Sequence, residues 1–188
     1  MKIKITENSV FENINFPEKE ALTGTYEDCV FKGCTLTDLS YISFEDCVFE
    51  HCNLSMCNLN NTSFKNVKFN NCKLLGLIFT HCNPFLFSVK FENCFLNLAS
   101  FYKLKLKATT FKNCELQEID FTNCDLTGAV FDNCNLGLSI FQNTILEKAD
   151  FITSYNFSID VENNKMKGVK FSRLNLAGLL DKYNLVLE

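Results

Sequence analysis

Apolar side chains recur at every fifth position along most of this chain of 188 residues. If the central apolar residue of each pentapeptide is called position i, one unbroken register places thirteen Phe or Leu residues in succession from Phe91 to Phe151. A second register covers residues 44–79, and a third, less regular one covers residues 11–36. So long a run at one period indicates a structural repeat.

A period of five fits neither a helix nor a flat strand. In a strand, side chains at odd separations point to opposite faces, and in a helix every fifth residue is rotated by about 140° from the last. The remaining solution is a backbone that turns a corner once per pentapeptide. Positions i and i−2 then face a common axis and the other positions face solvent, which is the pattern of a solenoid.

The strict alternation of Phe and Leu after residue 91 indicates four sides. With four sides, residues twenty apart stack Phe over Phe and Leu over Leu, and successive coils lie about 4.8 Å apart, as hydrogen-bonded strands do. The registers are joined by steps of eight and of twelve residues, where ten would keep phase. We therefore expect register slips near residues 37–43 and 80–90.

All eleven cysteines fall at position i−2, which Ala, Ser and Thr otherwise occupy most often. No two cysteines are separated by only two residues, as zinc ribbons and redox motifs require. Position i−2 therefore selects side chains by their volume, and the thiols are expected to be buried, reduced and inert. Reduced cysteines, no long apolar run and no signal-peptide start together predict a cytoplasmic protein without a membrane partner.

Charge is arranged in stripes along the chain. Residues 18–50 hold eight acidic and two basic side chains, residues 65–107 one acidic and seven basic, and residues 111–160 eight acidic and two basic. A surrogate of duplex DNA would need continuous negative potential along a face, so local contacts are the better prediction. Four carboxylates are candidate partner-binding groups, with solubility of a flat β surface as the alternative: Glu115, Asp120, Asp125 and Asp132.

The longer register slip contains the segment NPFLFSV, residues 83–89. Two extra residues must leave the regular path there, and Pro84 cannot donate to a strand ladder. Either Phe85 or Phe87 is then a candidate anchor that protrudes toward a protein partner. The alternative is an aromatic side chain that refills the core around the bulge. No series of exposed aromatic side chains, on which bases could stack, lies among the lysines of residues 103–107, so we expect no direct binding of nucleic acid.

The end of the solenoid requires a cap, because its last coil exposes unpaired backbone groups. Residues 175–188, NLAGLLDKYNLVLE, have helical spacing of apolar residues, with Ser172 or Asn175 as N-cap and Asn184 as a left-handed terminus. We therefore divide the chain into a repeat domain, 1–174, and a capping helix with an apolar tail, 175–188. This end is either an intramolecular lid or a homodimer interface, whose candidate residues are Leu176, Leu179, Leu180, Tyr183, Leu185 and Leu187.

The sequence offers no constellation for catalysis. It has no Ser-His-Asp arrangement and no HExxH, Walker or GxGxxG pattern, and its two histidines cannot serve inward-facing cysteines as bases. The flat or convex sides of a solenoid also lack the concave pocket that catalysis needs. We expect no enzyme activity, no cofactor and no bound metal.

Motifs such as CELQE, CDLTG and ADFIT resemble the pentapeptide repeat A(D/N)LXX across roughly residues 11–176. That resemblance implies an all-β fold, a right-handed quadrilateral β-helix solenoid with a short C-terminal helix. The ending SYNFSIDVENNKMKGVKFSRLNLAGLLDKYNLVLE resembles the quinolone-resistance (Qnr) and microcin-immunity members, which dimerise through this end. It implies a non-catalytic protein that protects DNA gyrase or topoisomerase IV from inhibitors or toxins. The alternative is an interaction scaffold with no topoisomerase link, because fold alone does not define function.

Overall fold

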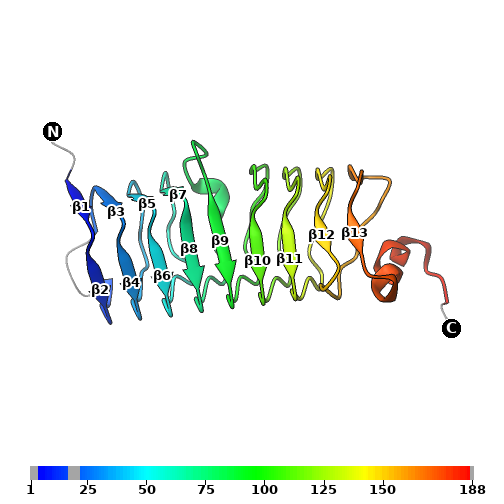
Figure 1. Ribbon diagram of the computed structural model, residues 1–188, viewed down its shortest axis with the longest axis horizontal. Coiled ribbons are helices and arrows are strands. Elements are labelled where there is room, and N and C mark those ends of the chain that lie inside the picture. The colour runs from blue at the N-terminus through cyan, green and yellow to red at the C-terminus, as the bar shows by residue number, and fades with distance from the viewer. Residues whose placement is uncertain (1–3, 17–21, 187–188) are drawn as a thin grey trace.

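The computed structural model describes residues 4–16 and 22–186, which form one rod of stacked coils (Figure 1). Nine parallel strands run along one side of the rod: β2 (Val10–Glu12), β4 (Val30–Lys32), β6 (Val48–Glu50), β8 (Val67–Asn70), β9 (Val89–Glu92), β10 (Thr110–Lys112), β11 (Val130–Asp132), β12 (Asp150–Phe151) and β13 (Lys170–Phe171). Four more form a second parallel sheet in the N-terminal half: β1 (Ile5–Glu7), β3 (Thr25–Glu27), β5 (Ser43–Glu45) and β7 (Ser63–Lys65).

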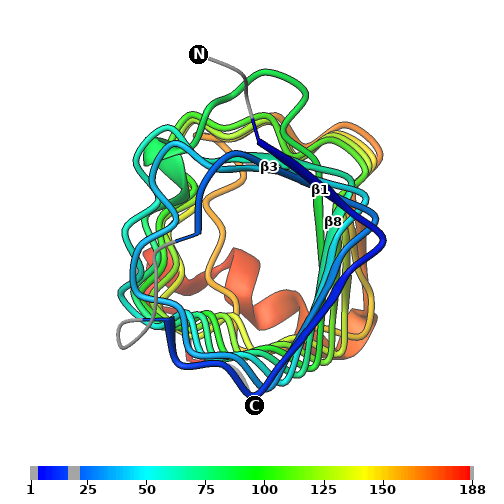
Figure 2. The same ribbon diagram turned by 90° about the vertical axis from the view of Figure 1, so that its left-hand side faces the viewer.

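Each coil has four sides, as the end view shows (Figure 2). Side 1 is the nine-stranded sheet, and the next two sides are columns of isolated bridges that pass through Glu115 (side 2) and Asp120 (side 3). Side 4 begins as the four-stranded sheet and continues as the column through Asp125. Seen from the N-terminal end, the chain runs clockwise as it recedes, so the predicted right-handed quadrilateral β-helix is confirmed.

Two coils differ in length from the others, as the pairing of strands on side 1 shows. Phe111 pairs with Phe131, twenty residues on, whereas Phe31 pairs with Phe49, eighteen residues on. The short coil arises on the way from side 2 to side 3. Leu39, the buried residue of side 3, follows Leu36, the buried residue of side 2, after three residues instead of five. The long coil separates residues 69 and 91, which pair across twenty-two residues. Its extra residues follow the short helix η2 (Phe79–His81).

The corners depend on position i+2, which adopts a left-handed backbone conformation. Asn93, Asn113 and Asn133 have φ values of 53°, 51° and 51°. Asn and Asp tolerate this region better than other residues with a side chain, which explains their frequency at the position. The corner amides also form a ladder between coils: Asn133 donates to Asn113 at 2.9 Å and Asn113 donates to Asn93 at 3.1 Å.

The core is a stack of aromatic rings flanked by leucines. Phe91, Phe111 and Phe131 stack on side 1 with centroids 5.2 and 5.0 Å apart and ring planes within 12° of each other. The column from side 3 meets them edge-on, as Phe121 does with Phe111 at 6.0 Å and 80°. Both arrangements are favourable aromatic geometries. In the N-terminal half the second column of rings lies on side 4 instead, where Tyr26, Phe44 and Phe64 stack.

Position i−2 has a second requirement besides volume. The thiol of Cys94 donates to the carbonyl of Phe69 one coil earlier, at 3.3 Å. The hydroxyl of Ser154 makes the equivalent bond to Phe131 at 2.7 Å. Burial raises the pKa of Cys47 and Cys124 to about 12, so these thiols keep the proton that they donate. The predicted burial of the cysteines is confirmed, but the prediction that volume alone selects the residue is incomplete.

The C-terminal end is helical but differs in form from the α-helix that the spacing predicts. It consists of two 3₁₀ helices, η3 (Arg173–Leu179) and η4 (Asp181–Tyr183). Ser172 caps η3 by accepting from the amide of Leu174, and Asn184 ends η4 with a φ of 50°. The carbonyl of Gly178 accepts from Ile159 at 2.9 Å instead of from the amide one α-helical turn later. The tertiary contact therefore competes with α-helical bonding, and the division of the chain at residue 175 stays a prediction.

Candidate functional site

The loop after η2 projects from the rod, as both views show (Figures 1 and 2). Phe85 and Leu86 are 67% and 63% exposed, and Leu86 has a left-handed φ of 56°. Phe87 turns inward instead and contacts Phe64 and Phe79 with ring centroids 6.4 and 6.3 Å away. The two alternatives left open by the sequence therefore apply to different residues, since Phe85 protrudes and Phe87 refills the core.

A shallow groove lies between this loop and the next coil. Residues 84–87 form one wall, and Lys103, Leu104 and Lys105 form the other. Sequence reasoning treated the loop and the lysines as separate features and missed Leu86. The signal available in the sequence was the excess of basic residues between positions 65 and 107, which includes the loop.

The four candidate carboxylates do not form one patch. Glu115, Asp120 and Asp125 lie in the bridge columns of sides 2, 3 and 4, and Asp132 lies in β11 on side 1. Successive pentapeptides occupy successive sides, so residues five apart in sequence turn away from one another. A single partner surface cannot contact all four at once, and their individual roles stay predictions.

Most of these carboxylates also have local partners. Glu115 accepts from the amide of Asn135 at 2.9 Å, and Asp125 pairs with Lys107 at 3.2 Å. Partial burial opposes ionisation of Asp125, but hydrogen bonds from Thr127 and Lys107 outweigh it and lower its pKa. On side 1, Lys112 neutralises Glu92 at 2.8 Å. These pairs explain how a flat β surface carries charge without a continuous negative face.

The C-terminal candidate residues differ in exposure. Leu179 packs on the core, whereas the other described candidates are exposed, and the choice between an intramolecular lid and a homodimer interface stays a prediction. The exposed fractions are 42% for Leu176, 36% for Leu180, 50% for Tyr183 and 56% for Leu185. Leu187 lies outside the described residues. Leu174, which sequence reasoning did not single out, is 92% exposed, and Val186 of the predicted apolar tail is 89% exposed.

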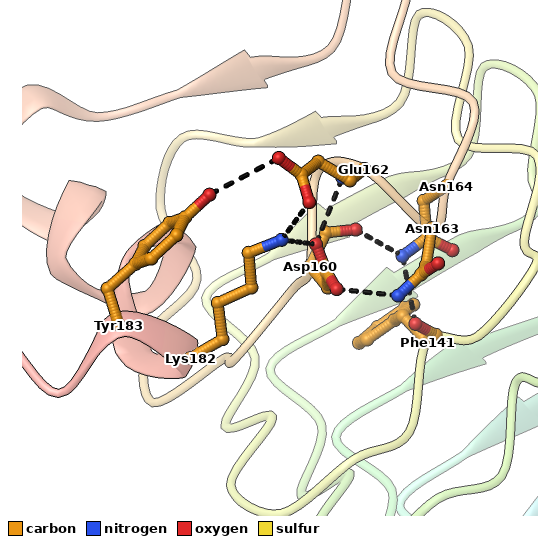
Figure 3. Close-up of polar contacts among 7 residues, drawn as sticks. All are labelled: Phe141, Asp160, Glu162, Asn163, Asn164, Lys182 and Tyr183. Carbon is orange, nitrogen blue, oxygen red and sulfur yellow. Dashed lines mark hydrogen bonds and ion pairs between the residues drawn. The ribbon is translucent and has the colours of Figure 1, made fainter.

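An ion cluster attaches this end to the last coil (Figure 3). The ammonium group of Lys182 donates to Asp160 at 2.7 Å and to Glu162 at 2.6 Å, and the hydroxyl of Tyr183 donates to Glu162 at 3.3 Å. These bonds lower the pKa of both carboxyl groups and raise the pKa of Lys182. The cluster therefore holds η4 against the segment that follows β12.

Attachment of the C-terminal end to the last coil is expected to weaken at acidic pH. The folded-state pKa values of Asp160 and Glu162 lie below the unfolded ones, so their stabilising effect is complete above the ordinary carboxyl range. It is lost as pH falls through the lowered values, below about pH 4. Carbon-detected NMR titration of Asp160 should show its pKa rising toward the ordinary range in a Lys182→Met variant, because Lys182 is the largest cause of the lowering.

The matched control for that titration is Lys170→Met, which removes the pair between Lys170 and Asp150 at 3.2 Å in another part of the rod. Its Asp160 should titrate as in the unaltered protein. An identical Asp160 titration in Lys182→Met and the unaltered protein would contradict the ion cluster.

Other classes of site find little support in the described part of the chain. No group of three His, Cys, Asp or Glu side chains there is placed to hold a metal ion. No helix in residues 4–16 or 22–186 is long and apolar enough to cross a membrane. The expectation that the protein has no enzyme activity stays a prediction.

Comparisons with known proteins agree with this architecture. The family profile "Pentapeptide repeat region" matches residues 42–121, and "Pentapeptide repeats (8 copies)" matches residues 119–154. A search of curated proteins found no match. Among solved structures, a trypsin-treated variant of QnrB1, a plasmid-mediated fluoroquinolone resistance protein, is 22% identical, with a TM-score of 0.58 over 98% of this chain and 92% of that chain.

A second trypsin-treated QnrB1 variant is 23% identical, with a TM-score of 0.53 over 98% of this chain and 90% of that one. At these identities the likeness concerns the fold. The two profiles together span residues 42–154, where the structure shows four-sided coils built from one pentapeptide per side, apart from the two extra residues of the long coil. The chain therefore belongs to the pentapeptide-repeat family.

Proposed function

We propose that this protein binds a type II topoisomerase, DNA gyrase or topoisomerase IV, and protects it from inhibitors or toxins without catalysing a reaction. The observation that carries the proposal is the likeness in fold to QnrB1, which extends over 98% of this chain and 92% of that fluoroquinolone resistance protein. Because topoisomerases act on DNA inside the cell, the proposal places the protein in the cytoplasm.

The projecting loop is the proposed contact with the enzyme. Phe85 and Leu86 present apolar side chains on a rigid scaffold, and interfaces are commonly anchored by a few such residues. Pro84 precedes them and is also exposed, whereas Phe87 supports the loop from inside. The carboxylates of residues 115–132 are secondary candidates, because they lie on different sides of the rod.

We also propose that two copies associate through their C-terminal ends. Leu176, Leu180, Tyr183 and Leu185 are exposed in η3, in η4 and next to them, and these helices lie at the end of the rod (Figure 1). Burial of this surface against a second copy would remove it from water, with a gain of about 25 cal/mol for each Å² of apolar area.

Supercoiling by DNA gyrase in the presence of a fluoroquinolone tests the proposed function. The unaltered protein is expected to restore supercoiling, and Leu86→Asn is expected to need about a tenfold higher concentration, because loss of an apolar anchor costs more than about 1 kcal/mol. The matched control is Leu138→Asn. Leu138 is also an exposed leucine with a left-handed φ, 59°, but it lies at a regular corner.

Two results would contradict the proposal in different ways. Equal loss of protection in Leu86→Asn and Leu138→Asn would exclude the loop as the contact. Absence of any effect of the unaltered protein on gyrase or topoisomerase IV, with or without drug, would favour the alternative of an interaction scaffold with no topoisomerase link.

A further inference from the structure

The groove beside the projecting loop combines apolar and basic surface. Phe85 and Leu86 are exposed on one wall, and Lys103 and Lys105 are exposed on the other, with the buried side chain of Leu104 between them. The two walls belong to successive coils, so the rigid stack of the solenoid sets the distance between them.

The lysines of the groove are free to meet an external charge. Among the described residues, Lys103 and Lys105 take part in no ion pair. Asp125 is the neighbour of Lys105 in the side 4 column, but its carboxylate pairs with Lys107 at 3.2 Å. Lys103 rests against the ring of Tyr102, with its ammonium group 4.8 Å from the ring centre.

A second pair of lysines lies on side 1, in the strands before and after the loop. Lys68 in β8 and Lys90 in β9 are direct partners in the parallel sheet, and both are exposed. Like charges at adjacent ladder positions repel each other. Lys90 follows the loop by only a few residues, so this pair adds positive charge to the surface into which the loop leads.

We infer that the groove between residues 84–87 and Lys103–Lys105 binds an acidic segment of a partner protein that carries a large apolar side chain. The carboxylates would meet the lysines, and the apolar side chain would lie against Phe85 and Leu86. This inference rests on the proposed function, in which the loop contacts a protein. A peptide fits better than nucleic acid, because the groove wall is apolar and offers no series of aromatic rings for stacked bases.

Fluorescence anisotropy with a defined probe tests the inference. The probe is a short fluorescein-labelled peptide in which one Leu-Phe pair is flanked on both sides by glutamates. We expect Lys103→Glu/Lys105→Glu to weaken binding by about tenfold or more, because two attractions become repulsions. Binding of the unaltered protein should also fall between about 0.05 and about 0.5 M salt, as ions screen exposed charges. A peptide with alanines in place of Leu-Phe should bind more weakly.

The matched control is Lys148→Glu/Lys165→Glu. Lys148 is a corner lysine with a left-handed φ of 59°, close to the 62° of Lys103, and Lys165 lies in the same side 4 column as Lys105. This control should bind the probe within about twofold of the unaltered protein, as expected for surface charges outside the site. Equal weakening in both double variants, no binding of the probe, or tighter binding of a single-stranded or duplex DNA oligonucleotide would each overturn the inference.

The supercoiling assay separates failure of this inference from failure of the proposed function. Suppose that probe binding depends on Lys103 and Lys105 but the protein does not protect topoisomerase. The groove would then stand as a binding site for an acidic segment, and the topoisomerase would be rejected as the partner. Protection that survives Lys103→Glu/Lys105→Glu but is lost in Leu86→Asn would retain the partner and reject the acidic segment.

Discussion

Replacement of Phe111 by alanine is expected to lower the free energy of unfolding by about 3–5 kcal/mol, as large truncations of buried aromatic residues do. Phe111 is 0% exposed and stacks between Phe91 and Phe131 with centroids 5.2 and 5.0 Å away. Its loss would leave a cavity in the axis of the rod and remove two ring stacks and the edge contacts with Phe101 and Phe121. Chemical denaturation followed by far-ultraviolet circular dichroism measures the change.

The effect should also be local, because each coil of a solenoid contacts only its neighbours. Hydrogen exchange in Phe111→Ala should show reduced protection first in the coils from residue 91 to residue 131. The control is Phe95→Ala, since Phe95 is 55% exposed on side 2 and its replacement should change stability by no more than about 0.5 kcal/mol. Equal destabilisation by the two substitutions would contradict the central column of rings as the main source of stability.

Replacement of Gly178 by alanine is expected to displace the C-terminal helices from the last coil. A β-carbon at Gly178 would overlap the carbonyl oxygen of Phe157, and a backbone atom cannot move aside as a flexible side chain can. Overpacking of this kind costs about 1–3 kcal/mol. The bond from the amide of Ile159 to Gly178 and the contacts of Lys182 with Asp160 should then be lost together.

Two measurements follow the consequences of that displacement. Hydrogen exchange should show faster exchange at Ile159, and light scattering should show a shift from dimer to monomer, since the proposed dimer surface moves with η3 and η4. Gly137→Ala is the control, because its nearest contact would be an ordinary 3.5 Å and the substitution should leave both readouts unchanged. Loss of Ile159 protection without a change in mass would place any dimer contact elsewhere.

Several features of the fold follow from single pentapeptides and were therefore open to prediction. Each repeat buries positions i and i−2 and turns a corner at i+2, so the period, the four sides and the stacked Phe columns could be read from residues such as Phe111, Phe121 and Phe131. The i−2 hydrogen bond was missed, because its acceptor is a carbonyl one coil earlier, as for Cys94 and Phe69. Local composition indicates the side-chain volume that position i−2 accepts, but it does not reveal a hydrogen-bond acceptor twenty-five residues away.

The functional surfaces depend on how coils of unequal length are stacked. Alternation of sides separates Glu115 from Asp120 and Asp125 although they are close in sequence. The opposite holds for the groove, where the loop of one coil meets Lys103 and Lys105 of the next. Pattern analysis treats these residues one by one, so it identified them without placing them correctly with respect to one another.

The sequence by itself determined a four-sided solenoid with inward cysteines and two register slips, because these features repeat at short range and each pentapeptide specifies its own corner; its right-handed coiling was implied only by the resemblance to the pentapeptide repeat. Only the tertiary structure decided that Phe85 protrudes while Phe87 fills the core, that the end consists of 3₁₀ turns, and that the loop shares a groove with Lys103. Each of these results depends on contacts between different coils, whose geometry is set by stacking and not by the repeat within one coil.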